Sequence, residues 1–143
     1  MDTIDSLRAE RERIVRLHMD AENRLDFETA LGTFGHPRYE LIATGTTHDG
    51  SEAVAQYFRD SRAVFPDQRN ELISLRHADD AVIVEFWLVG THRGRLGNVE
   101  PTGRSFRCRM TAFFIFEGAA LVCERVYFDS ATILRQITGE SPD

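Results

Sequence analysis

The sequence predicts an α+β fold in which helices come first and an antiparallel sheet follows. Three observations lead to this class. Apolar residues recur at helical spacing up to about residue 63, and from residue 71 to 128 they alternate as in β-strands. The long strands are apolar on both faces, so the sheet needs two covers. The helices supply one cover, and a second copy of the sheet is the simplest candidate for the other, which predicts a homodimer.

Length and composition predict one globular domain over residues 1–143. The chain is 42% hydrophobic, and its 23 acidic residues outnumber 17 basic ones. The resulting net charge of −6 argues against a nucleic-acid partner. No stretch reaches the roughly 18 uninterrupted apolar residues of a membrane span. The first residues have neither the basic nor the apolar region of a secretory signal, so we expect a cytoplasmic protein without a membrane partner.

The first helix is predicted over residues 3–25, with an apolar stripe centred on Ile14 that includes Leu25. His18 lies about 40° from the centre of this stripe at 100° per residue. Such a histidine is either a core residue with satisfied hydrogen bonds or a polar group directed into a cavity, and the sequence leaves both open.

Two more helices follow the first. Asp26 is the expected N-cap of a short helix from residue 27 to about 33. Ser51 is the expected N-cap of a third helix that runs to about residue 63, before Pro66.

The rest of the chain predicts strands and one short terminal helix that starts near residue 130. The hairpin turn at Glu117 and Gly118 joins the last two strands. The predicted strands span residues 39–44, 71–76, 81–91, 105–116 and 121–128.

Ionisable side chains occupy strand positions that are otherwise apolar. They are Glu85, Arg107, Arg109, Glu124 and Asp129. Because an unpaired buried charge is destabilising, such residues either form cross-strand ion pairs or serve chemistry. For Asp129, at the exit of the last strand, the alternatives are an N-cap for the terminal helix or a carboxylate at the mouth of a cavity.

The histidines and cysteines lack the spacing of a metal site, so we predict no metal and no cofactor. A Gly-rich phosphate loop and a nucleophile elbow are also absent from the sequence. These absences leave cofactor-free acid–base chemistry in an apolar pocket, or simple ligand binding.

Four segments resemble the SnoaL-like polyketide cyclases of the NTF2-like superfamily. They are Gly90-Thr91-His92-x-Gly94, Pro101-Thr102-Gly103-Arg104, Glu124 to Asp129, and Leu134-Arg135-Gln136-Ile137. The resemblance implies a cone: a curved antiparallel sheet with N-terminal helices that enclose a pocket, dimerised through the sheet. It also implies one acid/base aspartate near the end of the last strand, and Asp129 is the matching residue. Ketosteroid isomerases carry a base carboxylate after the first strand, whereas this chain has Ala43-Thr44-Gly45-Thr46 there.

The resulting functional hypothesis is an intramolecular aldol cyclisation on a hydrophobic, polyketide-like carbonyl compound. Asp129 would transfer the proton, and Arg109 or His92 would donate to the enolate oxygen. The residues predicted to bind the substrate are His18, Leu25, Phe58, Trp87, Phe113 and Tyr127. The alternatives are an isomerase- or dehydratase-type enzyme, and a non-catalytic domain for small-ligand binding or association.

Overall fold

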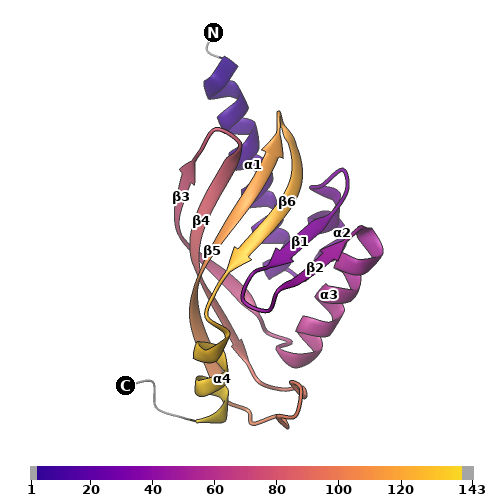
Figure 1. Ribbon diagram of the computed structural model, residues 1–143, viewed down its shortest axis with the longest axis vertical. Helices are drawn as coiled ribbons and strands as arrows, with labels where there is room; N and C mark the ends of the chain where they lie inside the picture. The colour runs from indigo at the N-terminus through magenta and orange to yellow at the C-terminus, as the bar shows by residue number, and fades with distance from the viewer. Residues whose placement is uncertain (1–2, 140–143) are drawn as a thin grey trace.

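The computed structural model describes residues 3–139, which form a six-stranded sheet with helices packed on it (Figure 1). The strand order is β2-β1-β6-β5-β4-β3. Within the described range, no helix is long and apolar enough to cross a membrane. The elements are α1 (Thr3–Asn23), α2 (Phe27–Gly32), β1 (Arg38–Leu41), β2 (Thr46–Asp49), α3 (Ser51–Val64), β3 (Arg69–His77), β4 (Ala81–Thr91), β5 (Ser105–Glu117), β6 (Ala120–Tyr127) and α4 (Ser130–Thr138).

Strands β3 to β6 form the predicted antiparallel meander, and the α+β class is confirmed. Two details differ from the prediction. Strand β1 pairs with β6 in parallel, and the edge strand β2 at Thr46–Asp49 was not predicted. Most side chains of β2 are exposed, so this strand has no apolar alternation that a sequence pattern could reveal.

Helix α1 ends at Asn23, two residues before the predicted end. The Asp26 N–H donates to Ala21 O at 2.8 Å, and Leu25 adopts a left-handed backbone with φ of +59°. This geometry closes a helix C-terminus and turns the Leu25 side chain outward, leaving it 50% exposed. The prediction that Leu25 forms part of the pocket wall is therefore wrong.

The predicted N-cap of the second helix is confirmed, because the Asp26 side chain accepts a hydrogen bond from the Thr29 N–H at 3.2 Å. The N-cap of the third helix lies one residue before the predicted position. Its N-cap is Gly50, with φ of +96°, and Ser51 is its first helical residue.

The two faces of the sheet differ in burial. Alternate residues of β4 and β5 are buried on the face where α1 contacts β4 and α4 contacts β5, and they include Phe86, Met110 and Phe114. Glu124 on β6 is the register partner of Phe114 and alternates in phase with Val126, so it lies on this same inner face. Among residues 3–139, the helices therefore cover one face only, and the outer face has no cover from this part of the chain.

The loop after β4 closes against the end of α3. The N–H groups of Arg93 and Gly94 both donate to Val64 O at 3.0 Å. A Cβ on Gly94 would lie 2.0 Å from Ala63 O, so only glycine fits at this contact. This close approach fixes the C-terminal end of α3 relative to the sheet.

Candidate active site

An apolar cavity of about 470 Å³ lies between the inner face of the sheet and the helices. This volume falls within the range of small-molecule sites. Most of the wall is aliphatic or aromatic, contributed by β4, β5, β6, α3 and α4. The polar or ionisable side chains on the wall are Glu22, Tyr39, Thr44, Tyr57, Ser61, Arg62, Gln68, Arg69, Asn70, Glu124 and Ser130.

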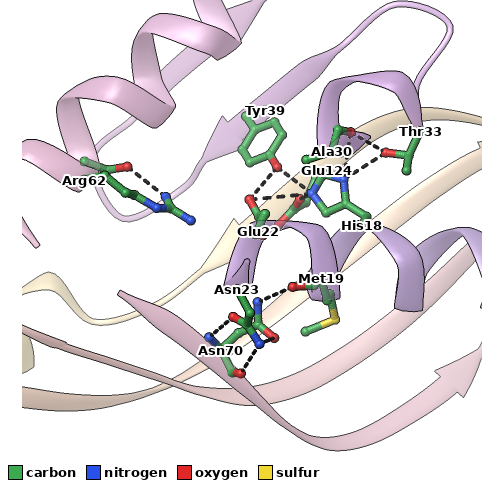
Figure 2. Close-up of polar contacts among 11 residues, drawn as sticks. His18, Met19, Glu22, Asn23, Ala30, Thr33, Tyr39, Arg62, Asn70 and Glu124 are labelled. Atoms are coloured by element: carbon green, nitrogen blue, oxygen red, sulfur yellow. Dashed lines mark hydrogen bonds and ion pairs between the residues drawn. The ribbon is translucent and has the colours of Figure 1, made fainter. Parts of the chain in front are cut away.

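Three of these polar side chains, Glu22, Tyr39 and Glu124, meet in one cluster with His18, which lies behind the wall (Figure 2). His18 and Glu22 lie one helical turn apart on α1, so both side chains point the same way. Tyr39 on β1 and Glu124 on β6 are register partners of neighbouring strands. The His18 Nε2 atom lies 2.6 Å from the Tyr39 hydroxyl, 3.0 Å from Glu124 Oε1 and 3.6 Å from Glu22 Oε2.

Asn70 fixes the end of α1 that carries this cluster. Its backbone N–H donates to Asn23 Oδ1 at 2.8 Å, and the Asn23 side-chain amide donates to Asn70 O at 2.9 Å. The Asn70 amide also donates to Met19 O at 3.1 Å (Figure 2). These hydrogen bonds between α1 and β3 fix the position of the helix end that carries Glu22.

The hydrogen-bond partners of His18 determine its protonation. Thr33 donates its hydroxyl hydrogen to Ala30 O at 2.6 Å, so both oxygens near His18 Nδ1 act as acceptors, at 2.9 and 3.2 Å. Tyr39 donates to Glu22 Oε2 at 2.9 Å, so its oxygen accepts from His18 Nε2. Because both ring nitrogens face acceptors, the arrangement favours the imidazolium form.

The cluster separates the pKa values of its two carboxyl groups. Burial lowers the pKa of His18, but the charge of Glu22 and the close approach of both glutamates outweigh it and raise the pKa to about 10. Burial raises the pKa of Glu124, and repulsion by Glu22 adds to it. For Glu22, burial is outweighed by the charges of His18 and Arg62, and the pKa is lowered. The pKa values of the two carboxyl groups are thus moved in opposite directions.

Two tyrosines on the wall remain neutral donors. Burial raises the pKa of Tyr39 well above its ordinary value, and nearby Glu124 and Glu22 charges raise it further. Burial likewise raises the pKa of Tyr57. The Tyr57 hydroxyl can therefore donate a hydrogen bond to a ligand oxygen, whereas the Tyr39 hydroxyl already donates to Glu22, and neither group ionises near neutral pH.

The three predicted catalytic residues do not lie on the cavity wall. The Asp129 side chain is 65% exposed and caps α4, accepting hydrogen bonds from Ala131 N and the Thr132 hydroxyl at 3.0 Å each. Arg109 pairs with Glu85 at 2.7 Å on the outer face. His92 is fully buried in a loop, where its Nδ1 accepts from Thr102 N at 3.2 Å. The expectation that Asp129 opens into the cavity is thus not met, and the N-cap alternative describes its position.

The predicted substrate-binding residues divide into three groups. His18 lies directly behind the wall, in contact with Glu22 and Glu124. Phe58 is fully buried in the core, 5.5 Å from the Tyr39 ring centroid. The remaining residues lie away from the cavity: Trp87, Phe113 and Tyr127 on the outer face of the sheet, and Leu25 on the surface.

Sequence patterns contained part of the signal for the residues that were missed. Glu124 alternates in phase with Val126 and Phe128, both of which line the cavity. Glu22 follows His18 by four residues, so a cavity-directed His18 implies a neighbouring Glu22. The cross-strand interpretation is confirmed for Glu85, which pairs with Arg109, whereas Glu124 pairs with His18 instead.

The same cluster holds the atoms that could bind a metal ion. His18, Glu22 and Glu124 each place one potential ligand atom within 4.8 Å of the others. The Nδ1 bond to Ala30 O would orient His18 for this purpose. However, the short bond from His18 Nε2 to Tyr39 occupies the nitrogen that a metal would need. The absence of a metal stays a prediction.

The sequence as a whole carries a family signature. A sequence profile for the SnoaL-like polyketide cyclases matches residues 4–137. The chain belongs to the SnoaL-like polyketide cyclase family. This confirms the resemblance inferred from the four segments. No protein with a curated description shows significant similarity to the chain.

Solved structures of SnoaL-like and NTF2-like proteins share the fold. One similar structure is IdmH, a proposed polyketide cyclase from Streptomyces antibioticus, with a TM-score of 0.77, 23% identity, and coverage of 90% of this chain and 98% of that one. Another is a protein with a ketosteroid isomerase-like fold from Catenulispora acidiphila, with a TM-score of 0.74, 19% identity, and coverage of 90% and 93%. At these identities the similarity shows the fold alone.

Proposed function

We propose that the protein is a cofactor-free acid/base enzyme that acts on a hydrophobic carbonyl compound, with intramolecular aldol cyclisation as the reaction type. The single observation that carries the proposal is the His18, Glu22, Tyr39 and Glu124 cluster at the wall of an apolar cavity. Two carboxyl groups with pKa values moved in opposite directions are the usual basis for acid and base roles in one site. The family supports the reaction type.

Glu22 is the proposed base. Its carboxylate takes a proton from a carbon that lies between two carbonyl groups, and the resulting enolate carbon attacks the second carbonyl. Because the pKa of Glu22 is lowered, it is a weak base, and the substrate carbon has to be acidic already. Protonated Glu124 then donates to the new alkoxide oxygen. The product is an isomer of the substrate, so no further reactant is needed.

The hydrogen-bonded chain within the cluster provides the return path for the proton. After one turnover the proton resides on Glu22, and Glu124 has lost one. Tyr39 connects Glu22 Oε2 to His18 Nε2, which lies 3.0 Å from Glu124 Oε1. Transfer along these contacts restores the starting state without solvent entering the cavity.

The test is the exchange of the benzylic α-protons of 2-tetralone with deuterium, followed by proton NMR in D₂O. The wild-type protein is expected to accelerate exchange over buffer, and Glu22→Gln to reduce the acceleration by about 10²- to 10⁴-fold. Asp129→Asn, which removes the base implied by the family resemblance, is expected to exchange at the wild-type rate. Equal rates for wild type and Glu22→Gln, or loss of exchange in Asp129→Asn, would reject Glu22 as the base.

Two alternatives use the same cavity. An isomerase- or dehydratase-type enzyme would shift the ultraviolet absorbance of a cyclic enone without forming a carbon–carbon bond. A non-catalytic binder would bind 2-tetralone without exchanging its protons. The proposal also includes a cytoplasmic location. It includes no cofactor, no membrane partner and no nucleic-acid partner.

A further inference from the structure

Arg62 is a cationic side chain on the cavity wall whose hydrogen-bonding capacity is largely unused. It projects from α3 on the Glu22 side of the cluster (Figure 2). Its Nη1 donates to the adjacent Ser61 hydroxyl at 2.9 Å, and its buried Nε has no hydrogen-bond partner among residues 3–139. Within the same range no carboxylate lies within 4 Å of its guanidinium nitrogens.

Aromatic rings hold this guanidinium in place. Its Cζ lies 5.1 Å from the Phe27 centroid and 5.7 Å from the Phe58 centroid, both within cation–π range. Phe27 and Phe58 are themselves stacked, with centroids 4.7 Å apart. A guanidinium fixed on two rings presents its N–H groups in a set direction, which lowers the entropy lost when a ligand binds.

No carboxylate among residues 3–139 bonds the Arg62 guanidinium directly. The charge of Glu22 acts on Arg62 from beyond 4 Å, and Glu22 is itself bonded to Tyr39 and paired with His18. Arg62 is half-buried, where a charge without a bonded counter-ion is unfavourable. Arg69 also lines the cavity, but it is exposed, so water solvates it.

We propose that Arg62 is an anion subsite of the cavity, and that the ligand is a largely apolar molecule that carries one carboxylate. A carboxylate accepts two parallel N–H bonds from a guanidinium, which suits the two Nη atoms, because Nη2 makes no hydrogen bond among residues 3–139 and Nη1 donates only to Ser61. The apolar wall takes the rest of the molecule, while the carbonyl that reacts lies at Glu22 and Glu124. The inference rests on the proposed function only in treating the cavity as a ligand site.

The experiment is isothermal titration calorimetry with 2-naphthoate and 2-naphthamide, which have the same shape and differ in charge. Wild type is expected to bind the carboxylate about tenfold or more tightly, as hydrogen bonds between charged groups allow. Arg62→Met is expected to lose this preference, and Arg62→Lys to keep part of it. Arg59→Met, on the exposed side of α3 one turn earlier, is the matched control and is expected to keep the full preference. Circular dichroism checks the fold of each variant.

Several results would overturn the subsite: equal affinities in wild type, an unchanged preference in Arg62→Met, or loss of the preference in Arg69→Met instead. Failure of both probes to bind would also overturn it. Because equilibrium binding needs no turnover, the titration is repeated with Glu22→Gln. A preserved carboxylate preference in a variant that no longer exchanges α-protons, or in a wild type that never does, separates the subsite from the catalytic proposal.

Discussion

His18 is the residue on which the electrostatics of the cluster depend. It is fully buried, and its two nitrogens face oxygens from Thr33, Tyr39 and Glu124. Without the imidazolium charge, Glu22 would lose its principal stabilising neighbour and its pKa would rise. The lowered pKa of Glu22 therefore depends chiefly on this histidine, whereas the raised pKa of Glu124 follows chiefly from burial.

This charge makes a prediction about stability and pH. The folded-state pKa of His18 is about 10 and the ordinary value is 6.5, so folding favours the protonated form. The resulting stabilisation is fully present below pH 6.5 and disappears as the pH rises to about 10. In urea unfolding, wild type is expected to exceed His18→Gln in stability by more at pH 6.5 than at pH 10. A stability difference that does not change with pH would show that His18 is neutral in the fold.

The sequence indicated which side chains of the cluster face inward, but it did not indicate which of them contact one another. Alternation along β6 places Glu124 among inward-facing positions, and the helical pattern places His18 near the apolar stripe of α1. Their contact depends on how β6 packs against α1, a tertiary arrangement that no local pattern encodes. Asp129 was selected instead because the family resemblance points to the end of the last strand.

Among the elements, α4 explains the position of Asp129. Its carboxylate accepts from Ala131 N and the Thr132 hydroxyl, and thereby satisfies the free N-terminus of a nine-residue helix. Ile133 and Leu134 from this helix line the cavity. The aspartate thus shapes the site indirectly, by holding the helix that forms part of its wall.

The N-cap role predicts a specific pattern of stability. Asp129→Ala is expected to lower the free energy of unfolding by about 0.5–2 kcal/mol, whereas Asp129→Ser, which can also cap, is expected to remain close to wild type. Urea denaturation of the three proteins measures both effects. If Asp129→Ala proved as stable as wild type, the cap would contribute nothing to the fold.

The strands and helices of strong periodicity were predicted to within a few residues. Strand β4 has the predicted bounds, and β5 extends one residue further than predicted. The failures have local causes: β2 has no apolar pattern, and α1 ends early because Leu25 takes a left-handed conformation. An apolar pattern arises only where one face of an element is buried. Edge strands and helix ends are largely exposed, so their bounds cannot be predicted from such a pattern.

At the scale of the whole molecule, the outer face of the sheet carries aromatic and aliphatic side chains that no helix among residues 3–139 covers. Trp87 carries the Arg107 guanidinium 3.8 Å above its ring, and Phe113 contacts Tyr127 with centroids 5.6 Å apart. Ile73 and Tyr127 are 40% and 41% exposed. A face that combines aromatic, aliphatic and arginine side chains resembles the core of a protein–protein interface.

We propose that two copies associate through this face to form a homodimer. Light scattering after size-exclusion chromatography at micromolar concentration is expected to give twice the chain mass of 16.3 kDa. Phe113→Arg is expected to give monomers, because it adds a charge to the face. Leu17→Arg, on the exposed side of α1, is expected to leave the dimer intact. A wild-type mass of one chain would disprove the dimer.

The most direct measurement of the central claim is a crystal structure with 2-naphthol, an enolate mimic, bound to the protein. If Glu22 and Glu124 are base and acid, the hydroxyl oxygen should lie within hydrogen-bond distance of Glu124 or Tyr39, with the adjacent ring carbon against the Glu22 carboxylate. An empty cavity, or a naphthol seated beside Asp129, would contradict the account.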